Sequence, residues 1–175
     1  MDSYVEQIVP VRKTRGEQWL QIGLWAAAVL LIITCVAGFA LHLLGILSIL
    51  LVALAVGIGY GAYFLSSQMN VEYEYIFTNG DLDVDKILSK RSRKRVGSLK
   101  CRDIVRMGKY LPEEHRNETY NEKIVACNVD ESAWYAVAEG DAVSTLLIFK
   151  PDDRLLAAMK PYVPRMVMNR AIGGN

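Results

Sequence analysis

The feature that most constrains this chain is a long stretch without charge. Between Gln18 and Val71 the sequence contains no Asp, Glu, Lys or Arg, and most of its residues are apolar. One crossing of a bilayer needs roughly 20 apolar residues, so the stretch is long enough for two crossings and a short turn. A soluble helical hairpin would need to be covered on every side, which the rest of a 175-residue chain can hardly do. We therefore expect a transmembrane hairpin at residues 18–69.

The hairpin has one weak point, around His42 and Gly45, where we place its turn. The first span is expected at about residues 19–39 and the second at about residues 43–65. Aromatic side chains near the outer ends of both spans suit the membrane interface, namely Trp19, Trp25, Tyr60 and Tyr63.

The orientation of the hairpin follows from a small difference in charge. Arg12, Lys13 and Arg15 precede the first span, whereas the connecting turn has no Lys or Arg. The positive-inside rule places such an N-terminus in the cytoplasm, and two crossings return the C-terminus to the same side. We thus expect a cell-membrane protein with two spans and both termini in the cytoplasm.

The second span carries a face of small residues. Ala53, Gly57 and Gly61 are four residues apart and share one side of a helix. Small residues at this spacing allow helix backbones to approach closely in a membrane. We expect this face to pack against the first span, and homodimerisation through it is an alternative use.

The N-terminal segment, residues 1–17, precedes the uncharged stretch. Tyr4, Val5, Ile8 and Val9 are apolar at helical spacing, and Pro10 would end a helix there. As an amphipathic cytosolic segment it would lie at the membrane interface or dock on the C-terminal domain, and a disordered tail is the alternative.

After Asn70 the sequence alternates between apolar and polar residues. This pattern from Val71 to Phe77 predicts a half-buried strand, and Asn79-Gly80 favours the tight turn of a hairpin. We therefore predict a hairpin over residues 71–88. The basic residues that follow are expected to form the next turn, with further strands at residues 95–100 and 102–108.

The second half of this domain begins with a polar loop at residues 110–123. A strand and a second hairpin over residues 133–150 follow, and Pro151 and Asp152 favour the start of a helix that Pro161 and Pro164 limit. About seven antiparallel strands and one closing helix describe a small, partly open barrel or sandwich. The expected class is an α+β membrane protein: a two-helix transmembrane hairpin, then this β domain with its C-terminal helix at residues 70–175.

These features together resemble a known family. The membrane hairpin, EYEYIFTNGDLDV, a basic turn, RDIVRM and a terminal helix after FKPDD are similar to bacterial pleckstrin-homology-like (PH-like) domains that follow paired transmembrane helices. The chain more closely resembles a family of small Gram-positive bacterial membrane proteins with that architecture. The resemblance covers most of the chain and implies a PH-like fold without implying an activity. PH folds often bind lipid head groups or proteins, but fold alone does not transfer that role.

The strongest local charge lies in what we call the basic segment, residues 90–95. Five of its six residues are cations: Lys90, Arg91, Arg93, Lys94 and Arg95. From Lys86 to Lys109 ten basic residues face a single acid, whereas residues 110–153 carry ten acids and three basic residues. Anionic lipid head groups would attract such a segment beneath a bilayer. Pairing with acids of the same domain, solvation, and an acidic protein partner are the alternatives. Nucleic acid is not expected, because interleaved aromatic residues and a helix-turn-helix pattern are missing.

The sequence offers little catalytic chemistry. His115 lies beside Glu113 and Glu114 without the spacing of a closed metal site, and no GxSxG, HExxH or Walker-type motif is present. The cysteines Cys35, Cys101 and Cys127 form no CxxC pair and are expected as reduced thiols. We therefore expect no catalytic residue, metal or cofactor.

Two functional hypotheses remain open. The first is a non-catalytic, membrane-anchored PH-like module at the inner leaflet that binds anionic lipid, partner proteins or both. The alternative is an accessory or scaffold subunit of a larger membrane complex, which would contact its partner through the small-residue face of the second span.

Overall fold

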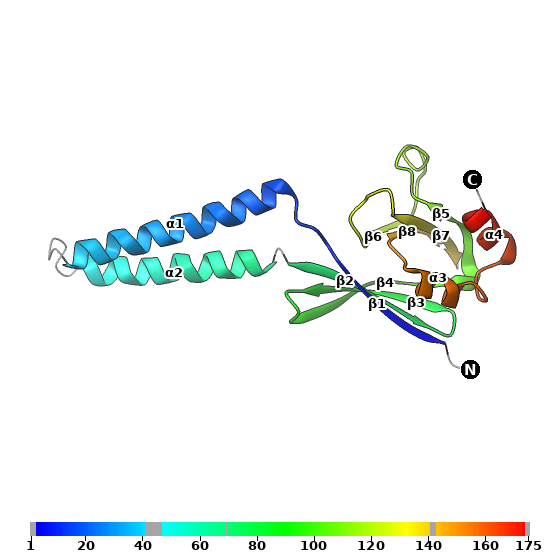
Figure 1. The fold of residues 1–175 in the computed structure, drawn as a ribbon, viewed down its shortest axis with the longest axis horizontal. Helices are drawn as coiled ribbons and strands as arrows, with labels where there is room; N and C mark the ends of the chain where they lie inside the picture. The colour runs from blue at the N-terminus through cyan, green and yellow to red at the C-terminus, as the bar shows by residue number, and fades with distance from the viewer. Residues whose placement is uncertain (1–2, 41–46, 69, 141–142, 174–175) are drawn as a thin grey trace. The chain divides into compact units, whose positions relative to one another are not determined.

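The computed structural model describes residues 3–40, 47–68, 70–140 and 143–173 (Figure 1). The chain divides into two compact units. The helical unit comprises residues 12–70, and the β unit comprises residues 1–11 and 71–175.

The helical unit contains two long helices, α1 (Arg15–Ala40) and α2 (Leu47–Gln68). A capping box begins α1: the Thr14 backbone N–H donates to Glu17 Oε2 (2.8 Å), and the Glu17 N–H donates to Thr14 Oγ1 (3.3 Å). These two bonds satisfy backbone donors that the first turn of a helix leaves without partners.

The two helices run antiparallel and side by side (Figure 1). Small side chains are buried along their contact: Ala28, Cys35, Ala55, Ala62 and Ser66. Gln21 links the helices, because its Nε2 donates to Ser66 Oγ (2.6 Å) while its Oε1 accepts from Lys13 Nζ (2.7 Å). Small contact residues and one polar bridge therefore fix the helix pair.

One helix within the described residues is long and apolar enough to cross a membrane. This candidate span, Arg15–Gly38, has a mean hydropathy of 2.3, and only 11% of its most apolar window is buried. Such low burial does not fit the core helix of a soluble protein. The apolar run described in α2, Val52–Ser67, is shorter than a span. The expected second span begins at residues 43–46, outside the described residues, so the structure supports neither two spans nor the cytoplasmic placement of both termini.

The β unit begins with a four-stranded antiparallel sheet, here called sheet A, in the order β1-β2-β3-β4. Its strands are β1 (Tyr4–Pro10), β2 (Val71–Thr78), β3 (Asp81–Leu88) and β4 (Ser92–Lys100). The predicted hairpin is confirmed: Thr78 pairs with Asp81, and the turn residues Asn79 and Gly80 have φ of 50° and 100°. A Cβ on Gly80 would lie 2.7 Å from the ring of Tyr162, so the turn also requires glycine for close packing.

The N-terminal segment forms a strand, and the helical spacing read there was misleading. Val5 and Val9 face the interior, whereas Tyr4 and Ile8 are exposed, which is the alternation of a strand. Every residue of β1 pairs with β2, from Tyr4 opposite Thr78 to Pro10 opposite Glu72. The segment is part of the β unit because β2 has an open edge that only a distant piece of chain can fill.

The second sheet, sheet B, has the order β5-β7-β8-β6. It comprises β5 (Ile104–Lys109), β6 (Glu122–Val125), β7 (Trp134–Gly140) and β8 (Val143–Phe149), and a short 3-10 helix, η1 (Cys101–Asp103), joins it to β4. The predicted second hairpin is β7–β8. One pairing differs from the expected antiparallel arrangement, since β6 lies parallel to β8. The described strands form two separate sheets and no closed barrel.

The main core lies between the sheets and the C-terminal helices. Its largest fully buried side chains include Tyr75, Phe77, Leu82, Leu147, Phe149, Leu155 and Met159. The single predicted C-terminal helix is two short helices, α3 (Asp153–Met159) and α4 (Arg165–Gly173). Asp152 caps α3 by accepting from the Leu155 backbone N–H (2.8 Å). Pro164 precedes α4, so the chain restarts as a new helix there.

Candidate functional site

The basic segment is divided between a turn and a strand. Ser89 and Lys90 have φ of 51° and 58°, which closes the β3–β4 turn early, and β4 begins at Ser92. The expectation that the run forms a turn is wrong for Arg93 and Lys94, whereas Arg95 lies in a strand as expected. Arg93, Lys94 and Arg95 belong to β4, which is an edge strand of sheet A.

Two cations of the basic segment are held by acids of the same sheet. Arg93 Nη1 lies 3.0 Å from Glu74 Oε2, and Arg95 Nη2 lies 2.9 Å from Asp83 Oδ2. Arg95 Nε also approaches Asp85 Oδ1 at 3.4 Å. These acids lie on β2 and β3 and not in the acidic half of the sequence. Pairing within the domain thus accounts for Arg93 and Arg95.

The two lysines of the basic segment, Lys90 and Lys94, are exposed. Lys90 lies in the turn, and Lys94 alternates with the two paired arginines along β4, so it points to the opposite face of the strand. The turn therefore presents cations on more than one side.

Glu74 is an unusual partner for an arginine on a sheet surface. Tyr75 and Phe77 point into the core, so alternation along β2 puts Glu74 on the opposite face of the sheet. The Glu74 side chain is nevertheless 0% exposed. It lies opposite Ile8 on β1 and Asp85 on β3. Within the described residues no hydrogen-bond donor of good geometry reaches either carboxylate oxygen.

The environment of Glu74 disfavours its charge. Burial raises the pKa of Glu74, the adjacent Glu6 raises it further, and the Arg93 guanidinium opposes both. The pKa of Glu6 shifts the other way, because Tyr4 Oη donates to Glu6 Oε2 (2.8 Å) and a protonated Glu74 can donate to it as well. Glu6 and Glu74 therefore form an acid pair whose two pKa values are shifted in opposite directions, upward for Glu74 and downward for Glu6.

The register of sheet A places the β3–β4 turn at a particular end. Val71, the first residue of β2, pairs with Leu88, the last residue of β3. Pro10, the last residue of β1, pairs with Glu72 at the same end. Both connections to the helical unit leave the sheet at this end, so chain connectivity puts the turn beside them.

The small-residue face of α2 is open in the structure. Ala53 and Gly57 are exposed, Gly61 is half-buried, and a Cβ added to either glycine would meet nothing within 4 Å. Contact with α1 is made instead by Ala55, Ala62 and Ser66, which lie on another side of α2.

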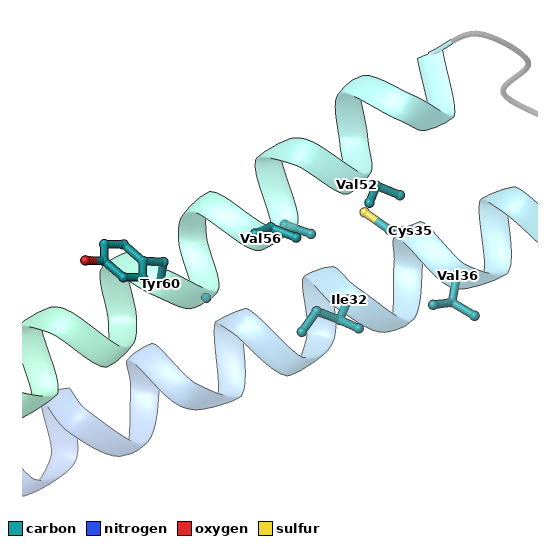
Figure 2. A pocket seen from close by; sticks show the side chains of 8 residues that line it. Ile32, Cys35, Val36, Val52, Val56 and Tyr60 are labelled. Carbon is teal, nitrogen blue, oxygen red and sulfur yellow. The ribbon is translucent and has the colours of Figure 1, made fainter.

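An apolar groove of about 630 Å³ runs between the two helices. Figure 2 shows side chains of both helices along it, including Ile32, Cys35 and Val36 from α1 and Val52, Val56 and Tyr60 from α2. Its lining offers almost no polar surface and suits an apolar occupant.

The loop from Tyr110 to Tyr120 holds a second polar cluster. The buried His115 ring stacks on Tyr110 at 5.5 Å between centroids and meets Tyr135 edge-on at 4.3 Å. Its Nδ1 lies 2.8 Å from Tyr120 Oη. Glu118 accepts a hydrogen bond from Tyr120 as well as a bidentate pair from Arg106, at 2.7 and 2.8 Å.

This cluster is built for structure. Arg106 and then Tyr120 lower the pKa of Glu118 to about 2, and burial raises the pKa of Tyr120 to about 12, so both groups keep their usual charge near neutrality. The cluster pins the loop over a small core on sheet B formed by Cys127, Ala133, Val137, Leu146 and Ile148. A pocket of about 600 Å³ beside it carries cations and acids in balance and so favours no ligand charge.

The cysteine and histidine side chains of the described chain show no catalytic arrangement. Burial raises the pKa of Cys101 to about 12 and that of Cys127 to about 11, which keeps both thiols protonated and unreactive. The described residues also include no group of three or more His, Cys, Asp or Glu side chains that could hold a metal ion.

Glu74 and the Arg106–Glu118 pair were not anticipated from the sequence. A signal existed for Glu74, because a two-residue Asn-Gly turn places it opposite Asp85. The Arg106–Glu118 pair had no such signal, since nothing local fixes how the loop returns to β5.

Neither curated proteins nor solved structures show a significant match to this chain. A family model does match, and it covers residues 1–169, including β1, both helices of the helical unit and nearly all of the β unit. The two sheets, antiparallel except for the β6–β8 pair, and the C-terminal helices agree with the fold of that family. The chain therefore belongs to the family described as bacterial PH-like domain (DUF6106).

Proposed function

We propose that this chain is a non-catalytic binding module, anchored in the cell membrane by its helical unit, whose β3–β4 turn contacts anionic lipid head groups. The observation that carries the proposal is the pairing of Leu88 with Val71. This pairing ties the basic turn to the end of the sheet from which the chain continues into the apolar helices.

Anchoring is supported by the dimensions of the helices. α1 has 26 residues, and at 1.5 Å per residue it measures about 39 Å, against about 30 Å for the hydrocarbon core. α2 has 22 residues and measures about 33 Å, although its described apolar run, Val52–Ser67, is shorter than a span. Both helices expose many large apolar side chains, for example Leu30, Ile33, Leu50 and Val56. We therefore propose a two-span hairpin whose ends, with Arg12, Lys13 and Arg15, lie on the cytoplasmic side.

Lipid contact is supported by the short connection. Two residues, Met69 and Asn70, connect α2 to β2, and the fully extended chain from Gln68 to Val71 is about 10 Å long. The turn that carries Lys90 and Arg91 follows Leu88, which pairs with Val71, the first residue of β2. Cations near an anionic leaflet gain roughly 1 kcal/mol each, within a Debye length of about 10 Å. Lys90 and Lys94, which are exposed, are expected to engage more than the paired Arg93 and Arg95.

The test uses the full-length protein reconstituted into vesicles with and without phosphatidylglycerol. A fluorophore on Ser92→Cys, beside the turn, is paired with an acceptor on the lipid head groups; the three native cysteines are buried and poorly available for labelling. We expect higher energy transfer in the anionic vesicles and a loss of the difference at high salt. Transfer that ignores phosphatidylglycerol would overturn the proposal.

A matched control separates the turn from overall charge. The variant Lys90→Ser, Arg91→Ser, Lys94→Ser should lose the response to anionic lipid. A variant with the same charge change at exposed positions elsewhere in the β unit, Arg116→Ser, Lys160→Ser, Arg165→Ser, should keep it.

A second candidate is the accessory-subunit role, which the open face of α2 favours. Because Gly57 and Gly61 have no neighbour within 4 Å of an added Cβ, a second helix could approach them closely. A photo-crosslinker at Phe64, seven residues after Gly57 and so on the same side of α2, should capture a partner or a second copy in native membranes. One at Val52, which lines the groove against α1, should not. Equal capture from both positions would remove this candidate.

A further inference from the structure

We propose that protonation of Glu74 releases Arg93 from its ion pair and thereby adds a cation to the lipid-facing turn, so that contact with anionic lipid strengthens as the pH falls. This regulation rests on the proposed function and concerns the same site.

The two members of the pair differ in their freedom to move. The Glu74 side chain is 0% exposed and lies between β1 and β3, whereas the Arg93 side chain is 62% exposed. Among the described residues, the 3.0 Å contact with Glu74 Oε2 is the ion pair that ties the guanidinium to this face, and Glu6 adds a weaker attraction at longer range. If the carboxylate loses its charge, the arginine is the group that moves, and Arg93 is two residues from Arg91 in the turn.

The charged groups around Glu74 favour protonation of Glu74 over protonation of Glu6. Glu6 on β1 and Asp85 on β3 are both acids, Tyr4 already donates to Glu6, and the charge of Arg93 on β4 opposes theirs at Glu74. A neutral Glu74 can donate a hydrogen bond to the Glu6 carboxylate, which relieves the repulsion between the two acids. Burial and Glu6 raise the pKa of Glu74, so it takes up a proton at a higher pH than an ordinary glutamate.

Arg95 does not respond in the same way. It contacts two carboxylates, Asp83 at 2.9 Å and Asp85 at 3.4 Å, so protonation of either one leaves the other in place. The pH response therefore depends on Arg93.

The experiment repeats the energy-transfer measurement on the full-length protein from about pH 7.5 down to about pH 4.5, just above the ordinary pKa of a glutamate. In vesicles containing phosphatidylglycerol, the ratio of docked to undocked β unit should rise about fivefold as the pH falls, which corresponds to about 1 kcal/mol for one added cation. Glu74→Gln mimics the protonated state and should show the low-pH value throughout. Glu72→Gln removes the same charge two residues away on the same face and should keep the wild-type response.

Arg93→Gln provides a second variant that leaves Glu74 in place. It should still dock on anionic lipid through the remaining cations but should lose the pH response. A constant docked ratio across the pH range in wild type, or a wild-type response in Glu74→Gln or Arg93→Gln, would overturn the regulation and leave lipid binding intact. No dependence on phosphatidylglycerol at any pH, in wild type and in Glu74→Gln, would instead overturn the proposed function.

Discussion

Two arginine–glutamate pairs in this protein use the same chemical groups with opposite results. Arg93 and Glu74 meet on sheet A at 3.0 Å, where the carboxylate is fully buried and no well-placed hydrogen bond reaches it. Arg106 and Glu118 meet over sheet B through two parallel hydrogen bonds, where the carboxylate is 34% exposed and also accepts from Tyr120. The pKa of the glutamate is raised in the first pair and lowered to about 2 in the second.

The comparison shows that exposure to solvent and the number of hydrogen-bond donors decide whether the pKa of a carboxyl group rises or falls. The presence of an arginine alone does not decide it. One cation does not offset the burial of Glu74 together with the nearby Glu6. Glu118 keeps part of its hydration and gains three strong donors. The first pair is therefore poised to change its protonation, whereas the second is a fixed clamp on a loop.

The largest effect should come from removing the cation of the buried pair. Arg93→Met leaves a buried charge without a partner, and we expect it to lower the free energy of unfolding by about 2 kcal/mol near neutral pH, less than for a fully buried pair because Arg93 is partly exposed. The loss should shrink as the pH falls, since a protonated Glu74 needs no cation. Urea denaturation of the full chain in mild detergent measures it.

A double variant tests the cause of that loss. Glu74→Leu combined with Arg93→Met replaces the pair by apolar side chains and should recover most of the stability. A double variant that is as unstable as Arg93→Met alone would show that Arg93 acts through packing and not through Glu74.

Removing the cation of the exposed pair should destabilise the protein less than Arg93→Met does. We expect Arg106→Met to lower the free energy of unfolding by about 1 kcal/mol, because Glu118 can return to water. The same substitution should bring the pKa of Glu118 back toward its ordinary range, which NMR titration of the side chain measures. A loss as large as that of Arg93→Met would abolish the contrast between the two pairs.

The smallest effect concerns the contribution of Glu118 to the pH dependence of the unfolding free energy. Its pKa is about 2 in the folded state and near 4.3 when unfolded, so its stabilisation is complete above the unfolded value and is lost as the pH falls through about 2. The difference in unfolding free energy between wild type and Glu118→Gln should accordingly be constant above about pH 5 and decline below about pH 4. A difference that does not change across this range would contradict the clamp.

Local features of the β unit were predictable from the sequence. The alternation around Tyr75 and the Asn79-Gly80 turn specify the first hairpin, because both act within a few residues. The same register places Glu74 opposite Asp85. The two-sheet PH-like fold followed from the order of such elements together with the family resemblance, and the family model confirms it.

Pairings between distant segments were not predictable. Neither β1 on the open edge of β2 nor the parallel β6–β8 pair has a signal in its own residues. The short run at residues 4–9 fits helical and strand spacing alike, so the partner strand chose between them. The split of the basic segment had the same origin, since the β3–β4 turn closes at Ser89 and Lys90 and leaves Arg93 on the sheet.

The sequence by itself determined the uncharged stretch, the first hairpin, the start of a helix near Asp152 and the concentration of cations near residue 90, because hydrophobicity, turn chemistry and charge are properties of neighbouring residues. Only the tertiary structure decided that Glu74 is buried beside Glu6 and held by Arg93. That burial exists because strands from residues 4–10 and 92–100 come together with β2 and β3, and the dielectric environment of a carboxylate depends on everything that surrounds it.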